Sequence, residues 1–174
     1  MALNCSTMSS LPIGAPGTVG ADATMNRPAW RTASALEQET RFVMPAPIQK
    51  WHLIVKSRDA HALKQLLAED VVFVSPVVHT PQLGRPITLA YLQAAMKVLN
   101  NPSFHYLNQW FGPESAVLEF ECVVEGITVN GIDMIHWNAD DRIDHFKVMV
   151  RPLKAVNKLH EMMGRELQRA ASQP

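Results

Sequence analysis

Residues 116–150 of this chain read AVLEFECVVEGITVNGIDMIHWNADDRIDHFKVMV, and their pattern is typical of a β-sheet. The stretch contains runs that are rich in β-branched and aromatic residues, at 116–125, 128–137 and 142–150. Gly126 and the sequence NADD separate these runs, and short connections of this kind join antiparallel strands. A similar run at 104–111 comes just before, so the sequence predicts an antiparallel meander of four strands.

Residues two apart in a strand share one face of a sheet, so each run can be divided into two faces. One set of faces is wholly apolar, at Leu118, Phe120, Cys122, Val124, Phe146, Val148 and Val150. The opposite faces combine charged residues with a large apolar one, at Glu119, Glu121, Lys147, Met149 and Arg151. We expect the apolar faces to line the interior and the charged faces to form the outer surface of the sheet.

The rest of the patterned chain predicts helices and one short strand. Apolar residues at helical spacing indicate two short helices within 47–67, a third at 87–99, and a fourth from Pro152 almost to the C-terminus. Asp59 is suited to cap the second helix. A buried strand is predicted at Val71–Val74. Helices gathered on one side of a curled antiparallel sheet give an α+β fold with a space between the layers.

Composition excludes several classes of protein. A length of 174 residues makes one domain the default. Lys plus Arg and Asp plus Glu number 16 each, so no net charge favours a nucleic acid or an anionic membrane as partner. No segment approaches the roughly 20 apolar residues of a membrane span. The two cysteines, Cys5 and Cys122, lie in unrelated contexts, which favours a reduced, cytoplasmic setting.

The N-terminal part of the chain has a different texture. Residues 1–45 are rich in Ser, Thr, Gly, Pro and Ala and show no regular period, so we predict a disordered extension before a domain at 46–171. Proline and glycine at 12–17 interrupt the apolar stretch that a secretory signal needs. Met25 and Met44 remain open as alternative starts to Met1, and a chain that begins at Met44 should melt at an unchanged temperature.

The element order and several motifs resemble nuclear transport factor 2 and the SnoaL-like proteins, a superfamily that includes the steroid delta-isomerases. The motifs are QKWHLIVKSRDAHALKQLLAEDVVFVSPV, LEFECVVEG, GIDMIHWNADDRI and FKVMVRPLKA. The resemblance covers about Pro47 to Val150. It implies a cone-shaped α+β fold, in which a curved antiparallel sheet packs its concave side against the helices around a conical cavity.

Asp133 is the residue that raises the question of function. It lies in the apolar run at 128–137, where both alternating sets of side chains are mostly apolar, so parity does not decide which way it points. The resemblance does, because it aligns Asp133 with the cavity-facing carboxylic acid of the steroid delta-isomerases. On this alignment Asp133 shares the cavity with Phe120, Ile135, Trp137 and Phe146. We then expect burial to raise its pKa and to keep it largely protonated at neutral pH.

Two other functional positions of the isomerases do not carry over. The position of their general base holds Ser75, and the position of their tyrosine donor holds Trp51. A serine without a basic partner does not shuttle protons, and an indole N–H donates a hydrogen bond but does not relay one. Steroid-type isomerisation is therefore disfavoured. Whether the protein is an enzyme stays open, with Asp133 and His79 as candidate catalytic residues.

The predicted ligand-binding residues combine the resemblance with the strand faces. They are Trp51, Ser75, His79, Phe120, Asp133, Ile135, Trp137, Phe146 and Val148. His79 follows the first strand beside the expected cavity mouth, although a lone loop histidine is most often only a loop residue. Trp51 and Trp137 serve equally well as plain core, and Asp133 as a structural acid bonded to Trp51. No cofactor is expected, and no cluster has the spacing of a metal site.

Three hypotheses follow from these residues. The first is a binding module for a small apolar molecule, oriented by Asp133 and Trp51. The second is an isomerase, cyclase or hydrolase that acts on such a molecule with Asp133 as the acid. The third is a dimeric scaffold or interaction domain with a filled core. An open pocket of about 300 Å³ or more with converging polar groups favours the first two hypotheses.

The outer face of the predicted sheet suggests a partner. Met149 lies there among charges of both signs, and related folds pair through this face, so we expect a homodimer. A plainly solvated face is the alternative, because exposed ion pairs contribute little.

Overall fold

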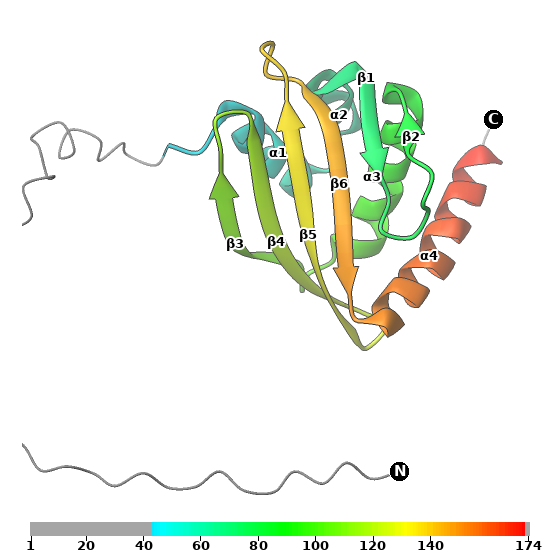
Figure 1. Cartoon of the computed structure of the whole chain (residues 1–174). Coiled ribbons are helices and arrows are strands. Elements are labelled where there is room, and N and C mark those ends of the chain that lie inside the picture. The colour runs from blue at the N-terminus through cyan, green and yellow to red at the C-terminus, as the bar shows by residue number, and fades with distance from the viewer. Residues whose placement is uncertain (1–42, 173–174) are drawn as a thin grey trace, which may run out of the picture. The chain divides into compact units, whose positions relative to one another are not determined.

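The fold is described from a computed structural model, which places residues 43–172 (Figure 1). The predicted disordered extension at 1–45 therefore lies almost wholly outside the described residues, as does Cys5. None of the helices in the described part of the chain is long and apolar enough to cross a membrane.

A six-stranded, open sheet forms one layer, with the strand order β2-β1-β6-β5-β4-β3. The strands are β1 (Leu67–Val74), β2 (Gln82–Leu83), β3 (His105–Phe111), β4 (Ser115–Val124), β5 (Ile127–Trp137) and β6 (Ile143–Arg151). The predicted antiparallel meander is confirmed as β3 to β6. One pair departs from the expected antiparallel sheet, because β1 runs parallel to β6. A parallel neighbour needs a long crossover, which α3 and the meander provide here.

Four helices form the second layer, and all lie on one face of the sheet (Figure 1). They are α1 (Ala46–Ser57), α2 (Ala60–Leu66), α3 (Arg85–Leu99) and α4 (Leu153–Ala171). The cap predicted for α2 is present, because the Asp59 carboxylate accepts hydrogen bonds from the backbone N–H groups of His61 at 2.8 Å and Ala62 at 3.1 Å. The predicted α+β class is thus confirmed.

Strand β2 is not among the elements that the sequence predicts. It consists of two residues that pair with Val72 and Phe73 of β1. So short a strand carries no alternating pattern of its own, and it forms because the chain turns back along the edge of β1.

The strand faces follow the predicted parity. In β4 the even-numbered side chains from Ala116 to Val124 are buried and the odd-numbered ones point outward. Gly131 of β5 lies directly opposite Phe120. A Cβ atom at Gly131 would come within 2.5 Å of the Phe120 ring, so glycine is required for that ring to lie over β5. The Phe120 ring is thereby positioned at the inner face of the sheet.

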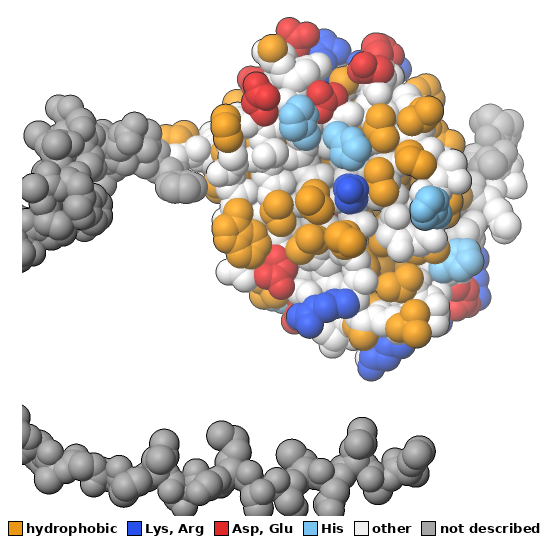
Figure 2. Space-filling model, viewed as in Figure 1, with side chains coloured by type: hydrophobic (Ala, Val, Ile, Leu, Met, Phe, Trp, Pro, Cys, Tyr) orange, Lys and Arg blue, Asp and Glu red, His pale blue; other side chains and the backbone are white. Residues whose placement is uncertain are grey.

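The outer face of the sheet carries a row of side chains across five strands. Register places Trp110, Val117, Met134, Lys147 and Val74 side by side in this row. Trp110 is 55% exposed and the nearby Met149 is 56% exposed. Figure 2 shows apolar side chains gathered on this face around a lysine and histidines. We call the apolar residues of this row, Trp110, Val117, Met134 and Val74, together with Met149, the outer apolar patch.

Candidate functional site

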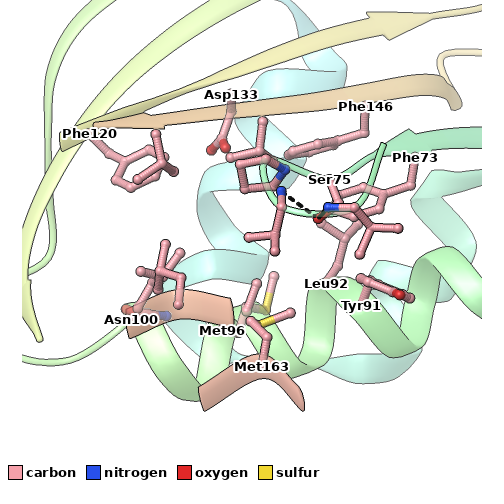
Figure 3. Close-up of a pocket in the computed structure, with 18 of the residues that line it drawn as sticks. Phe73, Ser75, Tyr91, Leu92, Met96, Asn100, Phe120, Asp133, Phe146 and Met163 are labelled. Atoms are coloured by element: carbon pink, nitrogen blue, oxygen red, sulfur yellow. Dashed lines mark hydrogen bonds between the residues drawn. The ribbon is translucent and has the colours of Figure 1, made fainter. Parts of the chain in front are cut away.

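A hollow of about 220 Å³ lies between the inner face of the sheet and helices α1, α3 and α4. Figure 3 shows its wall, in which Phe120, Phe146 and Asp133 come from the sheet and Met96 and Met163 come from the helices opposite. Most of the wall is apolar. Its titratable side chains are Tyr91, Tyr106, Asp133 and His160. The hollow is smaller than the 300 Å³ expected of an open ligand pocket, yet the core is not filled.

Asp133 projects into this hollow from the middle of β5, as the resemblance implied (Figure 3). Its cross-strand neighbours are Leu118 on β4 and Val148 on β6, and the residue is only 7% exposed. Burial raises the pKa of its carboxyl to about 7, against a hydrogen bond with Tyr106 that lowers it. Asp133 is then about half protonated at neutral pH rather than largely protonated.

Tyr106 on β3 connects Asp133 to Trp51. The indole N–H of Trp51 donates a hydrogen bond to the Tyr106 hydroxyl oxygen at 2.9 Å. The same hydroxyl lies on the side of Asp133, where its action as a donor lowers the pKa of the carboxyl. Burial and the neighbouring Asp133 carboxylate hold the pKa of Tyr106 well above its ordinary value, so the phenol stays neutral. The alternative that Asp133 bonds directly to Trp51 is corrected, because Tyr106 lies between them.

The direction of the hydrogen bonds between Trp51, Tyr106 and Asp133 follows from the number of protons that each side chain carries. A phenol has one proton, and because Tyr106 accepts from Trp51 it is free to donate that proton to Asp133. This direction agrees with the effect of Tyr106, which stabilises the ionised carboxylate and so lowers the pKa of Asp133. When Asp133 is protonated, its own O–H remains for a molecule in the hollow. When it is ionised, it can only accept.

Tyr106 was missed by the sequence analysis. It pairs across the strands with Phe120, a residue already assigned to the inner face. The same parity argument that placed Phe120 inward would have placed Tyr106 there as well. A tyrosine on the inner face indicates a functional candidate, because its buried hydroxyl needs a hydrogen-bond partner.

Ser75 lines the hollow but is occupied by the turn that follows β1. Its hydroxyl accepts hydrogen bonds from the backbone N–H groups of Val77 at 3.2 Å and Val78 at 3.3 Å. The Ser75 hydroxyl therefore stabilises a turn, and these hydrogen bonds involve no basic side chain. This agrees with the expectation that Ser75 is a poor substitute for a general base.

Three predicted site residues lie outside the wall of the hollow. His79 is exposed in the loop after β1. Ile135 and Trp137 are buried, but they pack in the same core cluster as Ile48 and Leu63 of the first helices. The alternation along β5 does place them on Asp133's side, but side chains of this core cluster fill the space around them. The other predicted residues, Trp51, Ser75, Phe120, Asp133, Phe146 and Val148, all line it.

The remaining histidines form no common site. His136 lies on the outer face, where its Nδ1 is 2.6 Å from a carboxylate oxygen of Asp144. Within residues 43–172, no three His, Cys, Asp or Glu side chains gather closely enough to hold a metal ion. Cys122 is a buried free thiol, and burial raises its pKa to about 11, so it packs as a small apolar side chain.

With this geometry, the chain belongs to the SnoaL-like domain family, whose model matches residues 48–146. A steroid delta-isomerase from Pseudomonas aeruginosa is 37% identical, with 74% of this chain and 93% of that chain covered and a TM-score of 0.69. An uncharacterised bacterial protein from Silicibacter pomeroyi is 30% identical, with coverages of 70% and 85% and a TM-score of 0.66. A nuclear transport factor 2-like protein of unknown function from Mesorhizobium loti, at 19% identity with coverages of 61% and 88% and a TM-score of 0.53, shares the fold. No curated protein matches the chain significantly.

Proposed function

We propose that this protein binds a small apolar molecule that carries one oxygen able to accept a hydrogen bond. The observation that supports this proposal is a buried carboxyl that projects into a mostly apolar hollow and has its pKa raised by burial to about 7. Burying a carboxyl is unfavourable, and a filled apolar core would be more stable without it. A ligand oxygen that accepts a hydrogen bond from the Asp133 O–H would explain why a carboxyl is buried here.

The Asp133 carboxyl selects the ligand by its protonation state. In the neutral state its O–H can donate to a carbonyl, ether or hydroxyl oxygen, whereas the apolar wall supplies contact with the rest of the molecule. In the ionised state it repels an acceptor. The affinity for a ketone should therefore fall as the pH rises through about 7, by roughly tenfold per pH unit once the neutral form becomes the minor species.

The size of the hollow limits the ligand. Sites for drug-sized molecules usually measure about 300–1,000 Å³. A hollow of about 220 Å³ is suited to a smaller molecule.

Binding of cyclohexanone and of cyclohexane to the wild type, Asp133→Asn and Asp133→Leu tests the proposal. The hydrocarbon matches the ketone in shape but lacks the acceptor oxygen. Asp133→Leu should weaken ketone binding about tenfold, the value of one hydrogen bond, and leave hydrocarbon binding unchanged or stronger. Asp133→Asn keeps an N–H donor and should retain most of the ketone affinity. Equal losses of both ligands, or none, would contradict the proposal.

Isomerisation is a second candidate, favoured by the 37% identity to the Pseudomonas aeruginosa steroid delta-isomerase. In such a reaction Asp133 would donate to the developing oxyanion of a β,γ-unsaturated ketone, while a base moved the proton between carbons. Ser75 does not supply that base. Among the wall residues, the histidine able to take a proton is His160, at the exposed edge. Turnover of a β,γ-unsaturated ketone that is lost in both Asp133→Leu and His160→Gln would favour catalysis over binding alone.

We also propose that two copies of the chain pair through the outer apolar patch. Trp110, Met134 and Met149 of this patch are exposed, and the same face carries Glu119 and Glu121 on β4 and Arg151 on β6. Under a two-fold axis, such a mixed surface can meet its own copy with charges of opposite sign. Sedimentation at micromolar concentration tests this, and a monomer at that concentration would contradict it.

A further inference from the structure

One face of helix α4 borders the hollow. The residues on this face recur at helical spacing, at His160, Met163, Gly164 and Leu167, and all of them line the wall. Of these, His160 is exposed, whereas the other three are half-buried. Ala155 and Leu159, nearer the start of the helix, are buried, whereas Met162 and Met163 are partly buried against the same core cluster. The part of α4 beyond Leu159 therefore covers the hollow more than it fills it.

Gly164 is unusual on this face because nothing in the packing requires a glycine. A Cβ atom built there meets no heavy atom within 4 Å, whereas one built on Gly131 would collide with Phe120. Gly164 also lies in the middle of a 19-residue helix, where glycine is less favourable than alanine. Neither a close approach nor a turn explains it. What the glycine leaves on this side of α4 is open space.

Gly164 on α4 and Asp133 on β5 line the same hollow. In Figure 3, Asp133 descends from the sheet, and Met163, the residue next to Gly164, lies on the helical side opposite it together with Met96 of α3. A ligand whose oxygen meets Asp133 therefore extends toward α4. The residue at position 164 is where an extended molecule would meet the helix.

We infer that Gly164 determines how long a ligand the hollow accepts. Its missing side chain gives room for the apolar tail of a molecule whose acceptor oxygen is held at Asp133. The ligand class is then an elongated, neutral, monofunctional molecule, such as an alkyl ketone, with the polar atom at one end. This inference rests on the proposed function.

A measurement without ligand tests the placement of the space. Gly164→Ala should raise the melting temperature by a few degrees, because alanine stabilises the helix. Gly164→Leu should raise it further, since leucine has nearly the same helix propensity and also buries an apolar side chain in the hollow. The exposed Asn157, on the same helix, gives the matched pair Asn157→Ala and Asn157→Leu, which should melt alike. If Gly164→Leu melts no higher than Gly164→Ala, position 164 faces solvent and the inference is overturned.

A measurement with ligands tests the length selection. Methyl butyl ketone and methyl nonyl ketone share the same acceptor group and differ in tail length. Gly164→Leu should weaken the long ketone at least tenfold and change the short ketone by less than about twofold, while Asn157→Leu changes neither. Equal weakening of both ketones would overturn the inference, because position 164 would then not select by length. If neither ketone binds the wild type, the proposed function and the ligand class fail together, whereas the melting comparison still decides where the space lies.

Discussion

Two carboxyls at neighbouring positions of the same sheet have pKa values that are shifted in opposite directions. Asp133 on β5 faces the hollow, and burial raises its pKa to about 7. Glu119 on β4 faces outward, and hydrogen bonds from the side-chain amides of Asn108 and Asn130 lower its pKa. The two positions are adjacent, because Asp133 pairs with Leu118 and Glu119 pairs with Ile132. The two carboxyls thus belong to adjacent cross-strand pairs. Burial favours the neutral form of Asp133, whereas hydrogen bonds favour the charged form of Glu119.

The comparison shows that the sheet face, rather than the residue type, decides what a carboxyl can do here. On the outer face, water and amide donors stabilise the anion, so Glu119 contributes charge to a surface. On the inner face Asp133 is buried beside a neutral phenol, and burial keeps the proton on its carboxyl up to about pH 7. A proton that can be donated into an apolar hollow is the chemical property that supports a ligand site.

The largest expected effect is on how stability depends on pH. The pKa of Asp133 is about 7 in the folded chain and 3.8 when unperturbed, so the folded state binds the proton more tightly. The wild type should therefore lose stability as the pH rises from about 4 to about 7, and this loss amounts to about 4 kcal/mol. Asp133→Asn should not show this loss. Denaturant unfolding of both proteins across this pH range measures it, and parallel curves would break the comparison.

The next effect concerns the outer face. Trp110→Glu places a charge in the outer apolar patch and should separate the proposed dimer, with a loss of at least about 2 kcal/mol in association. Arg151→Glu is a less direct test, because the Arg151 guanidinium already bonds the Asn130 side chain at 2.6 Å within its own chain. Sedimentation across a concentration series measures the dimer. An unchanged association constant in Trp110→Glu would show that this face does not pair.

A smaller effect is expected at Tyr106. Tyr106→Phe leaves the buried Trp51 N–H without its acceptor, which should destabilise the protein by about 1–3 kcal/mol. It also removes the hydrogen bond that stabilises the Asp133 anion, so the pKa of Asp133 should rise further. Adding Trp51→Phe removes the unpaired donor, and a double-mutant cycle should then show coupling between the two residues. Additive losses would mean that the hydrogen bond between them contributes nothing.

The smallest effect is expected at Glu119. The side-chain amides of the exposed Asn108 and the buried Asn130 hold this side chain, and Glu119→Gln should leave the pH dependence of unfolding unchanged above about pH 5. The variant is the outward-facing control for Asp133→Asn, since both replace a carboxyl by an amide. A comparable change in pH dependence would show that the two faces do not differ as described.

Much of the fold could be predicted from the sequence. The alternation in β4 and β6 was strong enough to assign their faces, and the runs 116–125 and 142–150 match the strands to within a few residues. The parallel pairing of β1 with β6 could not be predicted from residue pattern, since it depends on where the crossover returns the chain. Nor does β2 have any pattern, because two residues carry no period.

The candidate site was only partly predictable. Asp133 was placed inward by resemblance and not by parity, because apolar residues flank it on both faces of β5. Tyr106 could have been found from its strand partner, Phe120. The exclusion of Ile135 and Trp137 from the hollow could not be predicted, since the sequence does not show which part of the inner face packs against helices α1 and α2. The extent of a hollow depends on packing between distant elements, and strand parity carries no information about it.

The most direct test of the account is an NMR titration of the Asp133 side-chain carboxyl, assigned with the Asp133→Asn variant as reference. We expect a midpoint near pH 7, because the carboxyl is buried in a mostly apolar hollow with a neutral phenol beside it. Tyr106→Phe should move the midpoint upward. A midpoint near pH 4 would contradict the account, since it would place Asp133 in water or beside a positive charge and leave the hollow without a proton to donate.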